Sequence, residues 1–192
     1  MNTYTIFAGV NGAGKSSLFA SDYAILNKNE KRINTDEMVS RLGNWTDDKL
    51  QSKCAREAIR LIRFYLANAV SFNQETTLCG KSIISNIKKA KELGYYISVH
   101  FVTVNHYKIA QERVAHRVSI GGHGIPNEII KKRYFESFEN LKKIIPICDE
   151  IIIYENSSTD EMLRTVCIIE NGNITAKDNL DDYYYIFKLL NL

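Results

Sequence analysis

Residues 9–16 read Gly9-Val10-Asn11-Gly12-Ala13-Gly14-Lys15-Ser16, which fits the phosphate-binding pattern G-x-x-x-x-G-K-S. An apolar run over residues 4–8 precedes this stretch, and a helix-competent segment starting at residue 15 follows it. In such a strand-loop-helix context, the glycines let successive backbone N–H groups point at phosphate oxygens, and the helix adds the positive end of its dipole. A glycine-rich turn without a ligand is the alternative, and the flanking strand and helix disfavour it.

The loop supplies candidate ligands for ATP and Mg²⁺. Lys15 provides a charge for the β- and γ-phosphates, and Ser16 provides a hydroxyl for Mg²⁺, which makes Ser16 the candidate metal ligand. The predicted ATP-binding residues are Gly9, Val10, Asn11, Gly12, Ala13, Gly14, Lys15, Ser16 and Ser17.

Length and composition limit the possible partners. The 192 residues suffice for a single domain over 1–192 and are too few for two ordinary domains with a linker. A net charge of +3 with 24% charged residues predicts no broad basic face for duplex nucleic acid. No apolar run approaches the roughly 18 residues of a membrane span, and the loop begins too early for a preceding signal peptide. We therefore expect no membrane partner and a cytoplasmic location.

The four cysteines are widely spaced and form no C-x-x-C pair, which argues against a zinc site and against a disulfide framework. These residues are Cys54, Cys79, Cys148 and Cys167. Buried, reduced thiols are the simpler interpretation.

Strand-like and helix-like segments alternate along the chain. Strands are expected near residues 4–8, 31–36, 71–78, 95–104 and 150–154, with helices near 46–70, 82–93, after Asn105, and 128–144 after Asn127. Asn105 and Asn127 are the predicted N-caps of the last two helices. A C-terminal extension over 157–192 is expected to form a hairpin near 165–176 and a helix over 180–190. This order predicts an α/β, three-layer fold with a mostly parallel five-stranded sheet and helices on both faces.

Ligands bind beyond the carboxyl ends of the strands in such sheets, so the phosphate loop, Asp36 and the pair Glu75-Thr76 should meet in one cleft. Asp36 is a candidate base, because a carboxylate near the γ-phosphate can accept a proton from a substrate hydroxyl. The alternative for Asp36 is an N-cap of the helix that follows. Glu75 is a candidate for holding a substrate hydroxyl or a water on Mg²⁺, with a surface carboxylate as the alternative.

A glycine-rich segment at residues 119–126, which we call the flap, interrupts a helical region and predicts a lid over about 113–133. Arg113 and Arg117 are four residues apart and share a helix face next to the flap, where two guanidinium groups can close over ATP. Ordinary exposed helix arginines are the alternative. Arg133 is a weaker candidate, and His123 in the flap is a candidate for a phosphate contact or, more simply, a hydrogen bond within the loop.

Two other classes of phosphate-loop protein are disfavoured by missing motifs. The chain has no N-K-x-D motif after a late strand, which regulatory GTPases need to read guanine, and no L-S-G-G-Q stretch of a transporter-type ATPase.

The ordered set of motifs resembles the zeta-toxin family of bacterial kinases, in particular its compact "predicted ATPase" branch. The resemblance lies in the loop at 7–16, Asn34-Thr35-Asp36-Glu37, the stretch 75–78, Arg113, Arg117 and the flap, and covers residues 4 to about 156. It implies the nucleoside-kinase-like fold with a glycine-rich lid. It also implies phosphorylation of the 3′-hydroxyl of the amino sugar in UDP-N-acetylglucosamine with ATP and Mg²⁺, by a toxin that has an antitoxin partner.

By this resemblance Asp36 is the base, Lys15 and Ser16 hold ATP and Mg²⁺, and Arg113 and Arg117 flank the transferred phosphate. Glu75 and Thr76 belong to the substrate side, and we add Arg133 there. The predicted function is therefore an ATP-dependent kinase for a small-molecule hydroxyl. Two alternatives stay open: a kinase for another nucleoside, sugar or nucleic-acid hydroxyl, and a non-catalytic module whose flap reports ATP to a protein partner.

Overall fold

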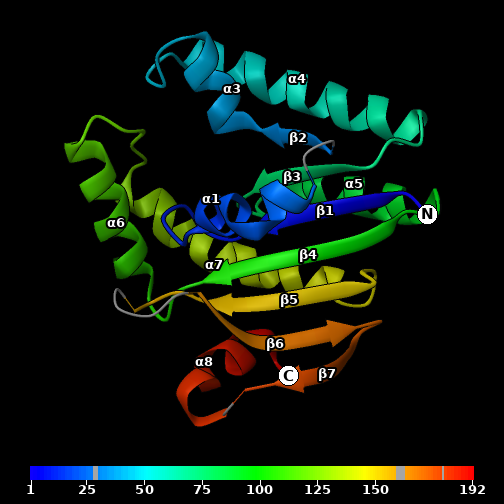
Figure 1. Ribbon diagram of the computed structural model, residues 1–192. Coiled ribbons are helices and arrows are strands. Elements are labelled where there is room, and N and C mark those ends of the chain that lie inside the picture. Colours follow the sequence, from blue (N-terminus) through cyan, green and yellow to red (C-terminus); the bar gives the residue numbers. More distant parts are fainter. Residues whose placement is uncertain (28–29, 159–162, 179) are drawn as a thin grey trace.

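The computed structural model describes residues 1–27, 30–158, 163–178 and 180–192 (Figure 1). The strands are β1 Thr3–Ala8, β2 Lys31–Asn34, β3 Phe72–Thr76, β4 Tyr96–Thr103, β5 Glu150–Glu155, β6 Arg164–Glu170 and β7 Asn173–Lys177. The helices are α1 Lys15–Leu18, η1 Phe19–Tyr23, α2 Ala24–Leu26, α3 Thr35–Leu42, α4 Asp48–Ala67, α5 Lys81–Glu92, α6 Tyr107–Ser119, α7 Asn127–Ile144 and α8 Leu180–Leu190. Of these, η1 continues α1 and is kinked at Ser21, whose φ of −67° and ψ of −139° are not helical.

The described strands form one sheet in the order β2-β3-β1-β4-β5-β6-β7. The strands β1 to β5 pair in parallel, as predicted, whereas β6 pairs antiparallel with β5 and β7 pairs antiparallel with β6. The predicted total of five strands is therefore wrong. The predicted hairpin at 165–176 extends the sheet because Val166, Cys167 and Ile169 of β6 are buried in the same core as Ile151 and Ile153 of β5.

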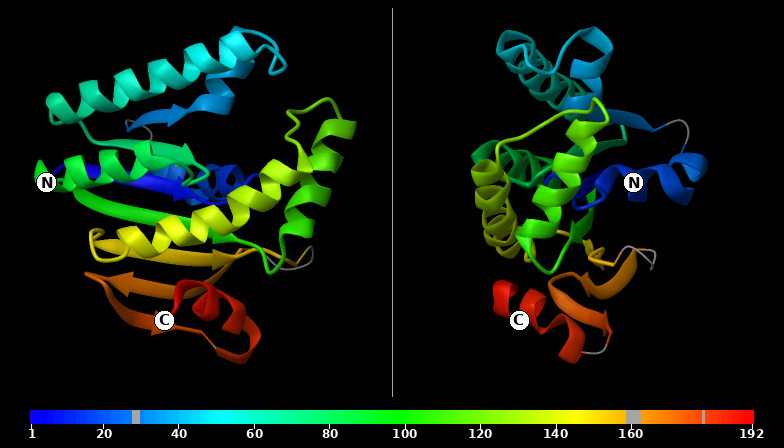
Figure 2. Two further views of the ribbon diagram at one scale, coloured as in Figure 1. Left: turned by 180° about the vertical axis from the view of Figure 1, so that it is seen from behind. Right: turned by 90° about the vertical axis from the view of Figure 1, so that its left-hand side faces the viewer.

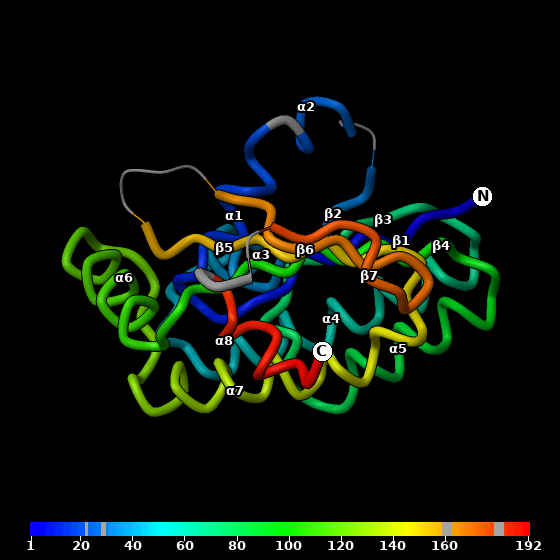
Figure 3. The backbone as a smooth tube through the Cα atoms, turned by 90° about the horizontal axis from the view of Figure 1, so that it is seen from below, coloured from blue at the N-terminus to red at the C-terminus, as the bar shows by residue number. Residues whose placement is uncertain are grey.

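Helices cover the two faces of the sheet unequally. The segment α1-η1-α2 lies on one face, and α5, α7 and α8 lie on the other (Figures 2 and 3). The core between the sheet and the second set of helices is apolar and fully buried; it includes Ile6, Phe72, Ile97, Val99, Phe101, Ile87, Ile130, Phe138 and Leu141. Burial of this kind supplies most of the driving force for folding.

The carboxyl ends of the parallel strands point to one edge of the molecule. Helix α6 and the flap project beyond this edge, next to the phosphate loop (Figures 1 and 2). The lid predicted over 113–133 therefore comprises the end of α6, the flap and the start of α7.

Two predicted helix caps are wrong. His106, and not Asn105, caps α6, because its Nδ1 accepts the backbone N–H of Lys108 at 3.2 Å. Asn127 is the first residue of α7 and follows Pro126, which occupies the cap position without a side-chain bond. The rigid φ of a proline suits the residue that leads into a helix.

Helix α4 starts as predicted, with Asp47 accepting the N–H groups of Lys49 and Leu50. It ends at Ala67. Its buried residues follow a strict spacing of four: Cys54, Ala58, Ile62 and Leu66.

The C-terminal extension contains the predicted hairpin and the predicted helix α8 over 180–190. Tyr183 is buried, whereas Tyr184 is 64% exposed. Residues 159–162 and 179 of the extension lie outside the described residues. Within the part of the chain that the structure describes, no helix is long and apolar enough to cross a membrane.

Candidate active site

The phosphate loop connects β1 to α1 and packs tightly against β4 and α6. A Cβ atom on Gly9, which has φ +136°, would lie 2.1 Å from the carbonyl oxygen of Val102 in β4. A Cβ atom on Gly12 would lie 2.5 Å from the carbonyl oxygen of Ala110 in α6. Only glycine permits both approaches, so the sequence pattern fixes the path of the loop as well as its phosphate-binding amides.

Asn156, after β5, holds the loop from another side. Its side-chain Nδ2 donates to the carbonyl oxygen of Ala13 at 2.7 Å. Sequence reasoning missed Asn156, because nothing in the pattern around a single asparagine after a strand indicates a bond to a loop 143 residues away.

Lys15 is buried at the base of the loop, with Nζ donating to the carbonyl oxygen of Val10 at 3.1 Å. Burial lowers the pKa of the Lys15 ammonium, while Glu75 and Asp36 nearby favour its charged form. The Lys15 ammonium is therefore desolvated at the position where the motif predicts phosphate oxygens.

Glu75 lies at the end of β3 and bridges the loop to β2. Its Oε1 accepts the hydroxyl of Ser16 at 2.8 Å, and its Oε2 accepts Nη2 of Arg32 at 2.7 Å and Nδ2 of Asn34 at 2.9 Å. The guanidinium of Arg32 also stacks on the ring of Phe19, 3.4 Å from its centroid. Glu75 is therefore a fixed carboxylate beside the predicted metal ligand, and not a loose surface group.

Arg32 was missed by sequence reasoning, and Asn34 was named only as part of the motif Asn34-Thr35-Asp36-Glu37, without a role of its own. The spacing Asn34-x-x-Glu37 is that of a capping box. Asn34 Oδ1 accepts the backbone N–H groups of Asp36 and Glu37 at 3.0 and 3.2 Å, and its Nδ2 donates to Glu37 Oε1 at 3.1 Å.

This cap decides the position of Asp36. The alternative that Asp36 caps α3 is wrong, since Asn34 is the cap and Asp36 is in the first turn. The Asp36 carboxylate is exposed and has no hydrogen-bond partner among the described residues. It is therefore available to a ligand.

Arg117 and Arg113 extend from α6 toward the loop. Arg117 Nε donates to the backbone carbonyl of His123 in the flap at 2.8 Å, a bond that does not involve the His123 side chain. Arg117 Nη2 is buried and, within residues 1–27, 30–158, 163–178 and 180–192, is the one buried side-chain nitrogen or oxygen without a partner. Arg113 Nη2 lies 3.4 Å from the carbonyl oxygens of Ser157 and Ser158.

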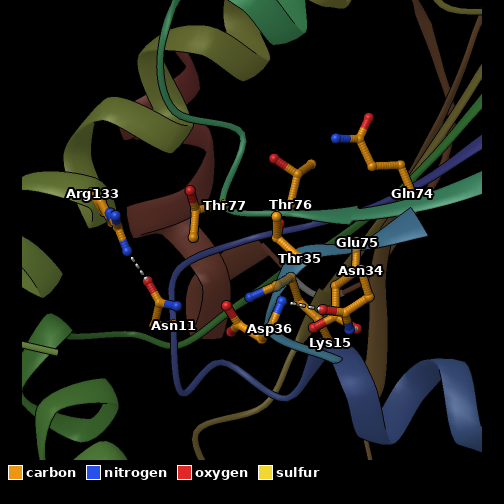
Figure 4. A pocket seen from close by; sticks show the side chains of 10 residues that line it. All are labelled: Asn11, Lys15, Asn34, Thr35, Asp36, Gln74, Glu75, Thr76, Thr77 and Arg133. Atoms are coloured by element: carbon orange, nitrogen blue, oxygen red, sulfur yellow. Dashed lines mark hydrogen bonds between the residues drawn. The ribbon is translucent and has the colours of Figure 1, made fainter. Parts of the chain in front are cut away.

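Arg133 and Thr76 line a cavity that Asp36 also borders. Arg133 Nη1, from α7, donates to Asn11 Oδ1 of the phosphate loop at 2.9 Å. Thr76 Oγ1 accepts the backbone N–H of Leu78 at 3.1 Å. Figure 4 shows Arg133 bonded to Asn11 at one end of a cavity and Glu75 at the other, with Lys15 and Asp36 between them in this view.

Three cavities meet at Asp36, and each is named here by its position. The phosphate cavity, of about 640 Å³, is lined by six residues of the segment 11–17 and by Arg113, Arg117 and Asn156 among others. The strand-end cavity, of about 180 Å³, is lined by Lys15, Glu75, Thr76 and Arg133 among others. The flap cavity, of about 520 Å³, lies between the α3-α4 loop and the flap. Asp36 is in the lining of all three.

Most of the predicted ATP-binding residues line the phosphate cavity, namely Asn11, Gly12, Gly14, Lys15, Ser16 and Ser17. Gly9, Val10 and Ala13 do not line it; the carbonyls of Val10 and Ala13 accept Lys15 and Asn156 instead. The buried lysine and the unpartnered guanidinium nitrogen suit a polyphosphate. In the described part of the chain no cluster of three or more His, Cys, Asp or Glu side chains forms a metal site.

Comparison with known proteins identifies the family. The model of the family described as "Zeta toxin" matches residues 2–167. The chain belongs to the zeta toxin family. It is also 32% identical over 133 residues to an uncharacterised protein of Haemophilus influenzae, an alignment that covers 69% of this chain and 93% of that one.

Solved structures similar to this zeta toxin family member show the same fold. A chain of the AvrRxo1-ORF1:AvrRxo1-ORF2 complex with sulphate ions matches with a TM-score of 0.78 at 15% identity, over 97% of this chain and 63% of that one. The chain thus spans less than two thirds of that protein. A structure from the PezAT chromosomal toxin-antitoxin system of Streptococcus pneumoniae matches with a TM-score of 0.64 at 14% identity, over 100% of this chain and 86% of that one. The fold is that of the P-loop kinases, as predicted.

Proposed function

We propose that this protein is an ATP- and Mg²⁺-dependent kinase of the zeta toxin type that transfers the γ-phosphate to a hydroxyl of a small molecule. The observation that carries the proposal is the unpartnered carboxylate of Asp36, which borders the phosphate cavity and both neighbouring cavities. A carboxylate in this position can receive the proton of an attacking hydroxyl.

The triphosphate is bound by the backbone amides of the loop and by three cations. Lys15 gains a phosphate partner for its buried ammonium, and the free Nη2 of Arg117 gains an acceptor. Arg113 lines the same cavity. Charge that spreads over the transferred phosphoryl oxygens is stabilised by these groups without reorganisation, because the fold already holds them in place.

Mg²⁺, when bound, neutralises phosphate charge during transfer. The hydroxyl of Ser16 would hold it, and Glu75, 2.8 Å from that hydroxyl, would accept from its waters. Arg32 and Asn34 keep Glu75 oriented for this task.

The acceptor hydroxyl lies against Asp36. Its oxygen forms a bond to the γ-phosphorus as the bond from that phosphorus to the β,γ-bridging oxygen breaks, its proton passes to Asp36, and ADP leaves. We assign Glu75, Thr76 and Arg133, which line the strand-end cavity, to the acceptor side. An anionic group of the acceptor fits near Arg133.

We further propose that the acceptor is the 3′-hydroxyl of UDP-N-acetylglucosamine and that the protein is the toxin of a cytoplasmic toxin-antitoxin pair, acting as one domain over residues 1–192. Membership of the zeta toxin family supports this assignment, and so does the fold shared with the PezAT structure. A kinase for another sugar, nucleoside or nucleic-acid hydroxyl is the second candidate, because the same cavities admit other hydroxyl compounds.

Mass spectrometry of a cell extract incubated with the protein, ATP and Mg²⁺ tests the proposal. A new phosphorylated metabolite is expected, and Asp36→Asn should reduce its formation at least about a hundredfold with ATP binding nearly intact. Asp48→Asn is the matched control, since Asp48 is also exposed in the first turn of a helix but lines none of the three cavities.

If ATP binds but no phosphorylated product forms with any extract, the non-catalytic binding module is the correct assignment. An unchanged rate in Asp36→Asn would reject Asp36 as the base.

A further inference from the structure

The chain turns directly after β5, and we call residues 155–157 the β5 turn. Glu155 ends β5, and its carboxylate accepts the backbone N–H of Ser157 with Oε1 at 3.0 Å and with Oε2 at 3.1 Å. The Ser157 hydroxyl also donates to Glu155 Oε1 and in turn accepts the backbone N–H of Asn105, which follows β4, at 2.7 Å. The carboxylate therefore holds the β5 turn in one shape and ties it to the end of the neighbouring strand.

Asn156, in the middle of the β5 turn, is an anchor of the phosphate loop. Its backbone N–H donates to the carbonyl oxygen of Thr103 at 2.9 Å, and its side-chain Nδ2 donates to that of Ala13 at 2.7 Å. The side chain approaches the loop so closely that a Cβ atom on Gly14 would lie 2.3 Å from Nδ2. The position of the loop therefore depends on the position of the turn.

Arg113 depends on the same segment. Its Nη2 lies 3.4 Å from the carbonyl oxygens of Ser157 and Ser158, which follow Asn156 directly. Arg113 and Asn156 both line the phosphate cavity. Movement of the β5 turn would thus displace two groups that border the predicted position of the triphosphate.

Helix α8 of the C-terminal extension reaches the β5 turn from the face of the sheet that also carries α7 (Figure 3). The helix is held in the core by the buried side chains Tyr183, Ile186, Phe187 and Leu190. The hydroxyl of Tyr185, which is half-buried, donates to Glu155 Oε1 at 3.4 Å. Burial, and then the charge of Glu155, raise the pKa of the Tyr185 phenol, so this hydroxyl stays protonated and able to donate at neutral pH.

We propose that Glu155 and Tyr185 are positioning residues of the nucleotide site, and that the β5 turn, supported by α8, holds Asn156 against the phosphate loop and Arg113 toward the triphosphate. Neither Glu155 nor Tyr185 lines the phosphate cavity, so both act through other residues. Groups that are already held in the bound geometry raise affinity, because less conformational freedom is lost on binding. This inference rests on the proposed function, since it concerns ATP, and it gives the C-terminal extension a part in that site.

Calorimetry of ATP binding to the full-length protein, with Mg²⁺ present, tests the role of Glu155. Glu155→Ala should raise the Kd of ATP at least about fivefold, because the turn loses its acceptor. Glu155→Gln should stay within about twofold, since its amide oxygen can still accept the donors that meet at Oε1. An unchanged Kd in Glu155→Ala overturns the proposal.

Glu150→Ala is the matched control for a purely structural effect. Glu150 is a half-buried carboxylate at the opposite end of β5, and it also accepts a serine hydroxyl, that of Ser98 at 2.8 Å. Thermal unfolding without ATP should show similar losses of stability in Glu150→Ala and Glu155→Ala, whereas only Glu155→Ala should weaken ATP binding. If Glu150→Ala raises the Kd as much as Glu155→Ala does, the effect is general destabilisation and the positioning role is refuted.

Two further variants test the route from α8 to the loop. Tyr185→Phe should raise the Kd of ATP about two- to threefold, and Tyr184→Phe, the same change at an exposed neighbour, should leave it unchanged. Equal Kd values in the two variants would refute the role of α8, and Tyr185→Phe carries the test if Glu155→Ala does not fold. Glu155→Ala combined with Asn156→Ala should raise the Kd by less than the product of the single increases, because both changes release one anchor. A full product would show that Glu155 does not act through Asn156.

The binding measurements separate this inference from the proposed function, because they require no phosphoryl transfer. If the Kd values change as expected but no phosphorylated product forms in any extract, the kinase assignment fails and the positioning role stands. If product forms and Glu155→Ala leaves the Kd of ATP unchanged, the positioning role fails and the kinase assignment stands.

Discussion

Replacement of Arg32 by methionine should destabilise the protein by about 2–3 kcal/mol. The side chains of Arg32 and Glu75 are only 15% and 10% exposed, and their closest atoms are 2.7 Å apart. Removal of one partner from a fully buried pair costs about 3–5 kcal/mol, because the other charge is left without compensation. We expect the lower part of this range or slightly less, since Glu75 keeps its bonds to Ser16 and Asn34.

Urea unfolding at pH 7 measures this free energy, and a double-mutant cycle with Glu75→Gln isolates the pair. We expect a coupling energy of at least about 1 kcal/mol between the two substitutions, because they share one hydrogen-bond network. The coupling should change little with salt concentration, since buried pairs are screened weakly. Arg60→Met is the control: Arg60 pairs with Glu57 on the exposed surface of α4, and its loss should have little effect.

The result that refutes the reasoning is a fully additive cycle. If Arg32→Met and Glu75→Gln destabilise independently, or if Arg32→Met costs no more than Arg60→Met, then Arg32 does not hold Glu75. The expected functional counterpart is a higher Mg²⁺ requirement of Arg32→Met, because Glu75 would lose the group that orients it beside Ser16.

Three further predictions follow from the site and the core. Arg117→Lys should lower the rate of phosphoryl transfer about a hundredfold or more, because lysine cannot donate to the His123 carbonyl and to the phosphate at the same time. The Kd of ATP should change little; single-turnover kinetics measures the rate and calorimetry the Kd. Lys15→Met should raise the melting temperature of the nucleotide-free protein by a few degrees and abolish the further increase on ATP addition, because a desolvated cation is removed. Burial lowers the pKa of His100 to about 4, below its ordinary 6.5, so the unfolded chain takes up the proton first and stability should fall by about 3 kcal/mol between pH 6.5 and pH 4. Urea unfolding across this range should show the loss in the unmodified protein and a smaller one in His100→Gln, and equal slopes would contradict the assignment.

The fold was predictable because local patterns and one topological rule agree. The phosphate-binding pattern at 9–16 predicts a strand before it and a helix after it. The alternation of strand and helix segments then predicts a parallel sheet whose strand ends converge. This convergence brings Asp36 and Glu75 to the loop although they are far apart in sequence. Their catalytic roles stay a prediction until the variants are measured.

Features that depend on tertiary contacts could not be predicted. The hairpin of β6 and β7 was recognised, but its pairing with β5 depends on which edge of the sheet is free, and local sequence does not contain that information. Trp45 stands alone in a polar loop without periodicity, and its partner His123 lies 78 positions later, so only the folded chain shows that the two rings meet edge to face. The position of Arg32 on a short strand gave no indication that its guanidinium would contact Glu37, Asn73 and Glu75.

The phosphate loop is held from four directions: by the backbone of β4 at Val102, by α6 at Ala110, by Asn156 and by Arg133. A loop confined in this way has little conformational entropy left to lose when a polyphosphate arrives. Nucleotide capture should therefore be a rapid, nearly rigid docking event, and the slower rearrangement in the catalytic cycle should belong to the glycine-rich segment above it. Because Ala110 of α6 and Arg133 of α7 contact the loop, we expect that a substitution in either helix can alter nucleotide affinity without touching the nucleotide.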